Sequence, residues 1–127
     1  MKLSTQQAAN SEFRHLVPHV SRYILRSVTR DITGNMGLQI CGLYLLIVSL
    51  AIEGTDPTTS ALVEHSRTAP QQIANLAKYL LDLEIVFREQ VHASHGRGRL
   101  HAYYPVTDIE ILKKLLNRQK LNENSDS

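Results

Sequence analysis

Apolar residues recur at intervals of three and four along several stretches of this chain, which is the spacing that gathers side chains on one face of a helix. From Ser11 to about Ile32 the pattern predicts a long amphipathic helix. Pro18 interrupts it, so the helix either starts near Pro18 or kinks there, because proline lacks a backbone N–H. A last amphipathic helix is predicted after Thr107, where Thr107 and Glu110 have the spacing of a capping box.

The stretch from about Gly37 to Glu53 is apolar on nearly every side rather than on one face. A helix of that kind must be buried on most sides, so this one is predicted to lie at the centre of the core. Its apolar run, from Leu38 to Ile52, is shorter than the roughly 18 to 20 residues that span a bilayer. The sequence therefore favours a core helix and no association with a membrane.

Residues 58–106 combine two helical patterns with two strand patterns. A short helix up to Ser66 is followed, after a very short connection, by a helix over residues 69–83, and such a pair is typical of a helix-turn-helix. The next residues alternate and are rich in β-branched and aromatic types, and a glycine-containing turn over residues 94–99 precedes a second strand pattern. The fold predicted is mainly α with a β-hairpin wing, a winged helix-turn-helix flanked by further helices.

The predicted helix 69–83 has an apolar face and a polar face. Amide side chains dominate the polar face, and amides suit bidentate contacts with adenine in the major groove. Arginines at the hairpin tip suit phosphates and the minor groove. The residues predicted to contact DNA are Arg67, Thr68, Gln71, Gln72, Asn75, Lys78, His95, Arg97 and Arg99.

The segment from Thr58 to Val106 resembles the DNA-binding core of winged-helix transcription regulators of the multiple-antibiotic-resistance (MarR) type. That family usually has glycine in the turn before the recognition helix and again before the wing, where this chain has Arg67 and Glu84. The resemblance implies a sequence-specific regulator of double-stranded DNA that acts as a dimeric repressor. The matching positions are Leu62, Val63, Ala69, Ile73, Leu80, Ile85, Val86, Arg97 and Arg99.

The apolar stripes of the first and last helices exceed what a small winged-helix core is expected to cover, so their burial across a two-fold axis predicts a homodimer. The resemblance also implies a small aromatic or phenolic effector, bound between the dimer helices and the DNA-binding lobe. Tyr23, Tyr44 and His15 are the polar-tipped side chains on those helices, although core packing is their more common role. The residues predicted at the dimer interface are Leu16, Val20, Ile24, Leu112, Leu115 and Leu116.

The length of 127 residues suits a single domain, predicted over residues 11–120, between a flexible arm at 1–10 and a polar tail at 121–127. The net charge of +2 is compatible with nucleic-acid binding without arguing for it, so the case depends on where the charges lie. A single cysteine excludes an internal disulfide, and the polar N-terminal residues do not resemble a signal peptide. The expected location is the cytoplasm.

The six histidines are weighed against a metal site or an enzyme. His15 and His19 are four residues apart, but no third ligand stands near them in a recognisable motif. His92, His95 and His101 fall in the wing, where contact of His95 with phosphate is a better hypothesis than a metal site. No catalytic motif appears, so no enzyme activity, metal or cofactor is expected. The alternative function is a winged-helix protein-interaction module without DNA binding, which would tend to expose apolar or acidic residues on helix 69–83.

Overall fold

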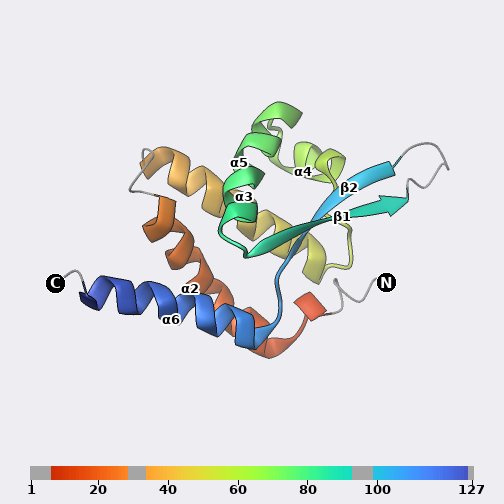
Figure 1. Ribbon diagram of the computed structural model, residues 1–127. Coiled ribbons are helices and arrows are strands. Elements are labelled where there is room, and N and C mark those ends of the chain that lie inside the picture. The colour runs from red at the N-terminus through yellow and green to blue at the C-terminus, as the bar shows by residue number, and fades with distance from the viewer. Residues whose placement is uncertain (1–6, 29–33, 93–98, 126–127) are drawn as a thin grey trace.

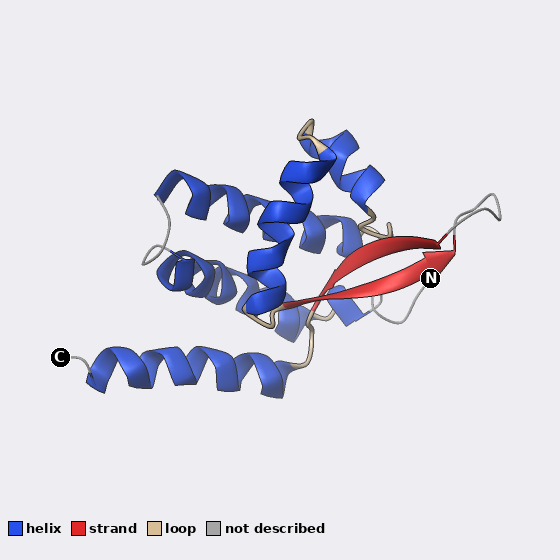
Figure 2. Ribbon diagram, turned by 45° about the horizontal axis from the view of Figure 1, so that its top comes forward, coloured by secondary structure: helices blue, strands red, loops and turns tan. Residues whose placement is uncertain are grey.

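The computed structural model describes residues 7–28, 34–92 and 99–125 of the chain. Helices dominate it, and an antiparallel hairpin follows the fourth of the named helices (Figures 1 and 2). This arrangement confirms the mainly α class with one hairpin and is compatible with a winged helix. The named elements are α2 (Ser11–Val28), α3 (Gly34–Ile52), α4 (Thr59–Ser66), α5 (Pro70–Asp82), β1 (Val86–His92), β2 (Arg99–Pro105) and α6 (Ile109–Ser125).

Helix α3 lies at the centre of the fold, in contact with α2, α5 and β2. Ile40, Tyr44 and Ile47 are completely buried within it, as the continuous apolar pattern predicted. The argument from length was wrong, however, because α3 begins at Gly34 and its window Asn35–Ile52 is long and apolar enough to cross a membrane by length and composition. Half of that window is buried inside the fold, and a core helix of a soluble protein passes the same test.

Helix α2 runs through Pro18 without ending, so it starts well before the proline, at Ser11. Its buried side chains, Phe13, Val20, Ile24 and Val28, face α3 and α6, which both pack against α2 (Figure 1). Val28 is the last described residue of the helix, and residues 29–33 lie outside the described part of the chain. The long amphipathic helix is therefore present with the predicted face inward.

The apolar stripes of α2 and α6 are covered within one chain, by each other and, for α2, also by α3. The dimer interface was predicted from these stripes because a small core was not expected to bury them. In the structure α6 follows the hairpin and packs on α2. Leu16 and Leu116 stay half-buried, and Ile111 on α6 is 47% exposed. The other four predicted interface residues are buried inside the protomer: Val20, Ile24, Leu112 and Leu115.

The start of α6 differs from the predicted capping box. The carboxylate of Asp108 accepts a hydrogen bond from the Ile111 backbone N–H at 3.2 Å, which is the role that was predicted for Thr107. The Thr107 hydroxyl instead lies 3.3 Å from the Gln7 side-chain oxygen and donates to it. Ala8, the residue after Gln7, is buried in the core. Residues 1–6 of the predicted arm lie outside the described residues. Helix α6 continues to Ser125, through most of the predicted tail.

Candidate nucleic-acid interface

Helix α4 is short and is fixed at both ends by local hydrogen bonds. The Thr58 hydroxyl accepts from the Ala61 N–H at 3.1 Å, which satisfies one of the free donors of the first turn. At the other end Arg67 takes a left-handed backbone, with φ of 56°, and its N–H donates to the Val63 carbonyl at 2.8 Å. This closes the helix in the manner that glycine usually allows, but with an arginine.

The connection from α4 to α5 is equally compact. The Ser66 hydroxyl donates to the Leu62 carbonyl at 2.6 Å and accepts from the Thr68 N–H at 3.2 Å. Helix α5 then begins at Pro70, where the missing N–H of proline costs nothing, and Ala69 occupies the N-cap position without a side-chain hydrogen bond. The turn is therefore held by α4 and by its own hydroxyls rather than by the cap of α5.

Helix α5 separates an apolar face from a polar face, as the sequence predicted. Ile73, Leu76, Ala77 and Leu80 are buried against the rest of the core. The polar side chains on the opposite face are all exposed, and two of them join because Gln71 Nε2 donates to Asn75 Oδ1 at 3.2 Å. This exposed face carries Gln71, Asn75, Lys78 and, at its C-terminal end, Asp82.

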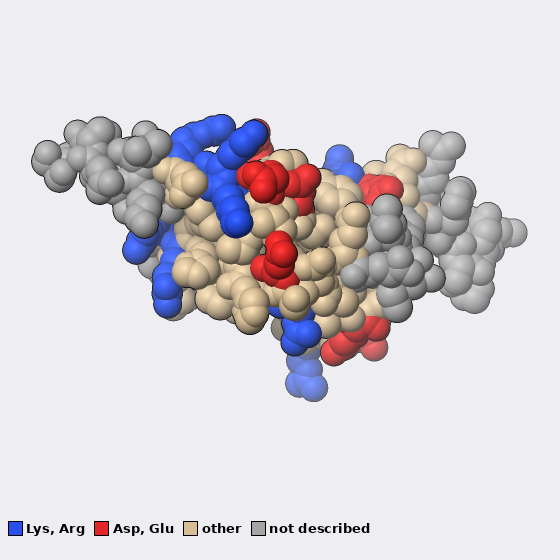
Figure 3. Space-filling view, turned by 90° about the horizontal axis from the view of Figure 1, so that it is seen from below, with Lys and Arg blue, Asp and Glu red and all other residues tan. Residues whose placement is uncertain are grey.

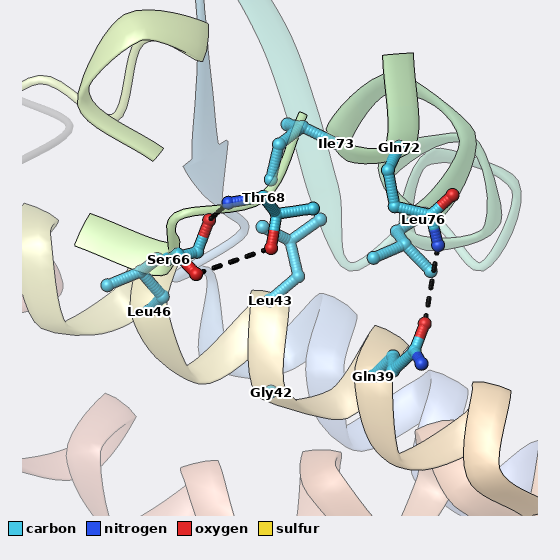
Figure 4. A pocket seen from close by; sticks show the side chains of 9 residues that line it. All are labelled: Gln39, Gly42, Leu43, Leu46, Ser66, Thr68, Gln72, Ile73 and Leu76. Atoms are coloured by element: carbon cyan, nitrogen blue, oxygen red, sulfur yellow. Dashed lines mark hydrogen bonds between the residues drawn. The ribbon is translucent and has the colours of Figure 1, made fainter. Parts of the chain in front are cut away.

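Gln72 does not share that outward face. Its side chain is half-buried, and its Nε2 donates to Gln39 Oε1 on α3 at 3.3 Å (Figure 4). Of the amides predicted to contact DNA, Gln72 is thus the one that the fold turns toward the central helix. Sequence reasoning did not single out Gln39, although an amide inside an otherwise apolar helix is a signal that could have found it.

The hairpin pairs β1 with β2 in a regular antiparallel register from Val86↔Pro105 to His92↔Arg99. It extends away from the helices at its outer end (Figure 2). The middle of β2 is tied to the residues before α4, because the backbones of Thr58 and Ala102 form an isolated bridge and the Tyr103 N–H donates to the Pro57 carbonyl at 3.0 Å. The segment before α4 therefore lies beside β2 and pairs with it through a single antiparallel bridge.

A side-chain bond strengthens the same junction. The Tyr104 hydroxyl donates to Asp56 Oδ1 at 2.6 Å, while the Tyr104 ring lies 5.7 Å from the ring of Phe87 between centroids. Burial, followed by the bond to the Asp56 carboxylate, raises the pKa of Tyr104 well above its ordinary value, so the hydroxyl stays protonated and remains a donor. The hairpin and the start of α4 consequently behave as one unit.

The predicted contacts at the hairpin tip are only partly placed. Arg99 is the first residue of β2, so its backbone lies at the outer end of the hairpin, next to the turn. His95 and Arg97 lie outside the described residues. Of the two turn residues predicted to contact DNA, Arg67 is exposed, whereas Thr68 is half-buried and lines the hollow between α3 and α5.

Two non-glycine residues in the described chain have a left-handed backbone, and both flank α5. Arg67 precedes the helix with φ of 56°, and Glu84 follows it with φ of 64°. Such a conformation costs an ordinary residue about 1 to 2 kcal/mol relative to the right-handed one. Each of the two turns that flank α5 therefore holds a non-glycine residue in an energetically costly backbone conformation.

The histidines of α2 and the predicted effector residues do not form a common site with the polar face of α5. His15 and His19 are exposed on α2, and among the described residues no group of three or more histidine, cysteine or acidic side chains could hold a metal ion. Tyr44 is completely buried, and its hydroxyl has no hydrogen-bond partner within the described part of the chain. Burial raises the pKa of Tyr44 above its ordinary value of 10.

Comparisons of the chain with models of protein families and with curated proteins gave no match.

Proposed function

We propose that this protein is a sequence-specific regulator of transcription that binds double-stranded DNA through α5 in the major groove. The observation that carries the proposal is the composition of the outward face of α5, where Gln71, Asn75 and Lys78 are exposed while the opposite face is fixed in the core. Amide and ammonium groups on a firmly held helix suit base edges and phosphates. The rival function, a protein-interaction module, would favour an apolar or acidic face at the same place.

The backbone of the two turns around α5 supports a likeness to regulators of the MarR type. Arg67 and Glu84 adopt the left-handed conformation at the two positions where that family usually carries glycine. A glycine is common at such positions because it lacks the Cβ that makes the conformation costly. The correspondence therefore follows from backbone geometry, although the residue types differ.

The proposed division of labour follows from the direction of each side chain. Gln71 and Asn75 are assigned to base edges, and their mutual hydrogen bond at 3.2 Å would be exchanged for bonds to a base. Lys78 and Arg67 are assigned to phosphates, which fix orientation without reading sequence. The wing residues Arg99, Arg97 and His95 are assigned to the backbone or the minor groove beside the site. Gln72 supports α5 from the α3 side rather than reading a base.

The proposed repressor acts as a dimer, because two recognition helices can then enter successive major grooves about 34 to 36 Å apart. The residues available for that contact on α2 and α6 are Leu16, Leu116 and Ile111, which remain partly or largely exposed. Sedimentation of the protein at micromolar concentration tests the dimer directly. A monomer under those conditions would contradict it.

The proposed DNA binding is tested by selecting bound sequences from fragmented genomic DNA. The selected duplex and a random duplex of equal length are then titrated over a salt series. We expect tighter binding to the selected duplex, and an affinity for both that falls as salt rises, since phosphate contacts release counterions. Equal affinity for the two duplexes would remove the claim of sequence specificity, and no binding to either would favour the protein-interaction module.

A further inference from the structure

Helix α3 has no charged side chain, although the fold covers only part of it. Half of its window Asn35–Ile52 is buried inside the fold. On the uncovered side, Leu38 is 63% exposed and Leu45 is 44% exposed. A helix of such composition is ordinarily buried on most sides, so the uncovered side of α3 is better suited to contact with another apolar surface than to water.

The uncovered residues of α3 lie on one face of the helix, because they are spaced by three, four and seven positions. Single exposed leucines are common on protein surfaces, but here apolar, small and uncharged polar residues follow one another along the helix. Leu46 is half-buried and the others are exposed. We call this surface the α3 face, and it comprises Leu38, Gln39, Gly42, Leu45, Leu46 and Ser49.

Gly42 lies in the middle of the α3 face, between the two exposed leucines. Glycine destabilises the interior of a helix relative to alanine. A Cβ added at Gly42 would meet no atom within 4 Å outside its own stretch of helix, so no neighbour in the described part of the protomer requires a glycine there. A second helix that crossed α3 at this point would require one, because the side chains at a crossing set how closely two helices approach.

The α3 face continues into the hollow between α3 and α5, which has a volume of about 400 Å³ (Figure 4). Gln39, Gly42 and Leu46 belong to both the face and the lining of the hollow. The apolar part of the lining consists of leucine and isoleucine side chains from the two helices. A hollow beside a row of leucines can accept a leucine from a neighbouring helix, since helices pack with the ridges of one in the grooves of the other.

The distribution of charge indicates which surface can cover the α3 face. The outward faces of α2, α5 and α6 carry charged side chains, such as Arg22, Lys78 and Lys114. Packed against leucines, those groups would lose water without gaining a partner, which is costly. Among the named helices α3 alone has no charged residue, so the same face of a second copy matches it without burying a charge.

We propose that two copies of the chain associate through their α3 faces, with the two helices crossing at Gly42. Leu38 lies four residues before Gly42 and Leu45 lies three residues after it. An antiparallel crossing on a two-fold axis therefore brings Leu38 of one copy beside Leu45 of the other, and the reverse. This inference rests on the dimer of the proposed function and gives it a contact on α3, in place of the partly exposed residues on α2 and α6.

Sedimentation of the full chain without DNA tests the contact with three variants of exposed residues. Leu38→Lys and Leu45→Lys should each weaken the dimer at least about tenfold, because each places a charge in an apolar contact. Ile111→Lys on α6 is the matched control and should change the dimer by less than about threefold. All three residues are exposed, so urea denaturation should show folded variants of similar stability.

The outcomes separate this inference from the proposed function. Dissociation by Ile111→Lys, with Leu38→Lys and Leu45→Lys still dimeric, would place the contact on α2 and α6 and overturn the inference alone. A monomeric wild type would overturn both the inference and the proposed dimer. Binding of DNA by α5 is measured separately, by the duplex titrations.

A pair of double variants tests the crossing itself. Because Leu38 of one copy lies beside Leu45 of the other, a chain with Leu38→Lys and Leu45→Glu would pair opposite charges across the two-fold axis. It should dimerise at least about tenfold more tightly than a chain with Leu38→Lys and Leu45→Lys, which pairs like charges. Equal self-association of the two double variants overturns the antiparallel crossing at Gly42.

Gly42→Leu tests the close approach of the two helices. The added side chain has free space in the protomer and removes a glycine from a helix, so the variant should melt at or above the temperature of the wild type at concentrations where both are monomeric. In the dimer the same side chain would hold the helices apart, and the dissociation constant should rise at least about tenfold. An unchanged dissociation constant overturns the proposal.

A lipid bilayer is the competing cover for the α3 face, because α3 is long and apolar enough to cross a membrane by length and composition. Flotation with phosphatidylcholine vesicles measures this alternative, and we expect the wild type to remain in the soluble fraction as a dimer. Flotation of the wild type that Leu38→Lys abolishes would assign the face to lipid and overturn the proposal.

Discussion

Two pairs of helices in this protein are amphipathic, yet they use their apolar and polar faces differently. In the α2–α6 pair the apolar stripes are covered within the chain, by each other and, for α2, also by α3, and the outward face is mixed: basic side chains gather toward one end and acidic ones lie across the middle (Figure 3). In the α4–α5 pair the apolar faces close on α3 and the hairpin, and the outward face of α5 is mainly amide. The same spacing of apolar residues thus holds the fold together in both pairs, and in α5 it also leaves a face of amide side chains exposed to solvent.

The contrast also shows what periodicity leaves undecided. An apolar stripe must be covered, but the spacing of its residues does not say whether the cover comes from the same chain or from a second copy. The position of α6 in space answers that question for most of this stripe. Substitutions in the α2–α6 pair should therefore act on stability, and substitutions on the outward face of α5 should act on binding.

The largest effect is expected from Leu112→Ala in α6. Leu112 is 1% exposed, and removing a buried leucine side chain costs about 2 to 5 kcal/mol in the free energy of unfolding. Urea denaturation measures this loss, and Ile111→Ala, at a position that is 47% exposed, is the matched control with an expected loss below about 1 kcal/mol. A Leu112→Ala protein that changed its oligomeric state while keeping its stability would show that the stripe joins two chains.

The next effect concerns Gln71→Ala on α5. Because Gln71 is exposed, the free energy of unfolding should change little, whereas discrimination at one base pair of the selected site should fall by about 1 to 3 kcal/mol. Titration of single-position variants of the duplex measures it. Gln72→Ala is the control, because its amide is engaged by Gln39, and its effect on base discrimination should be smaller. The reverse order of the two variants would contradict the assigned faces of α5.

Tyr44→Phe tests the helix that both pairs share. The buried hydroxyl of Tyr44 lacks a partner among the described residues, so its removal should stabilise the fold by about 1 kcal/mol. Burial raises the pKa of Tyr44 in the fold above its unfolded value of 10. The free energy of unfolding is therefore unaffected by ionisation of Tyr44 below pH 10, and it falls as the pH rises above 10 toward the folded pKa. Stability curves should accordingly fall less steeply at alkaline pH in Tyr44→Phe. A destabilised variant would indicate that the hydroxyl has a bound water or another partner.

The smallest effect is expected at the two left-handed turns. Arg67→Gly and Glu84→Gly should each raise the free energy of unfolding by about 0.5 to 1 kcal/mol, since glycine relieves the backbone cost but loses more freedom on folding. Only Arg67→Gly should also weaken binding to random DNA and reduce the salt slope by about one unit. Equal DNA binding by both variants would remove Arg67 from the proposed phosphate contacts.

Much of the fold could be predicted because it depends on local patterns. The face of α5 that includes Ile73 and Leu80, the burial of α3 and the two strands of the hairpin all follow from spacing and residue type. The cap of α6 could not be decided this way, since Thr107 and Asp108 are adjacent and both suit an N-cap.

The rest depended on contacts between residues far apart in the sequence. The bond between Gln39 and Gln72 joins positions 33 residues apart. The amide in the apolar α3 stands out in the sequence, but no pattern in either helix identifies its partner. The bridge between Thr58 and Ala102 involves a segment too short to show the alternation of a strand. For the candidate site, the sequence therefore identified the outward face of α5 but not the side chain that the fold turns inward.

The packing of α6 on α2 has a consequence for the order in which the protein is made. The ribosome releases α2 well before α6, because α3, the α4–α5 pair and the hairpin lie between them in the sequence. During that interval the side of α2 that α6 later covers has no permanent neighbour, and bare apolar surface on a nascent chain invites aggregation. Early termination of translation within α6 would leave the same surface uncovered in a chain that already contains the complete α4–α5 pair and hairpin. Such a product is a natural substrate for chaperones and proteases, so quality control of this protein should depend on its C-terminal helix.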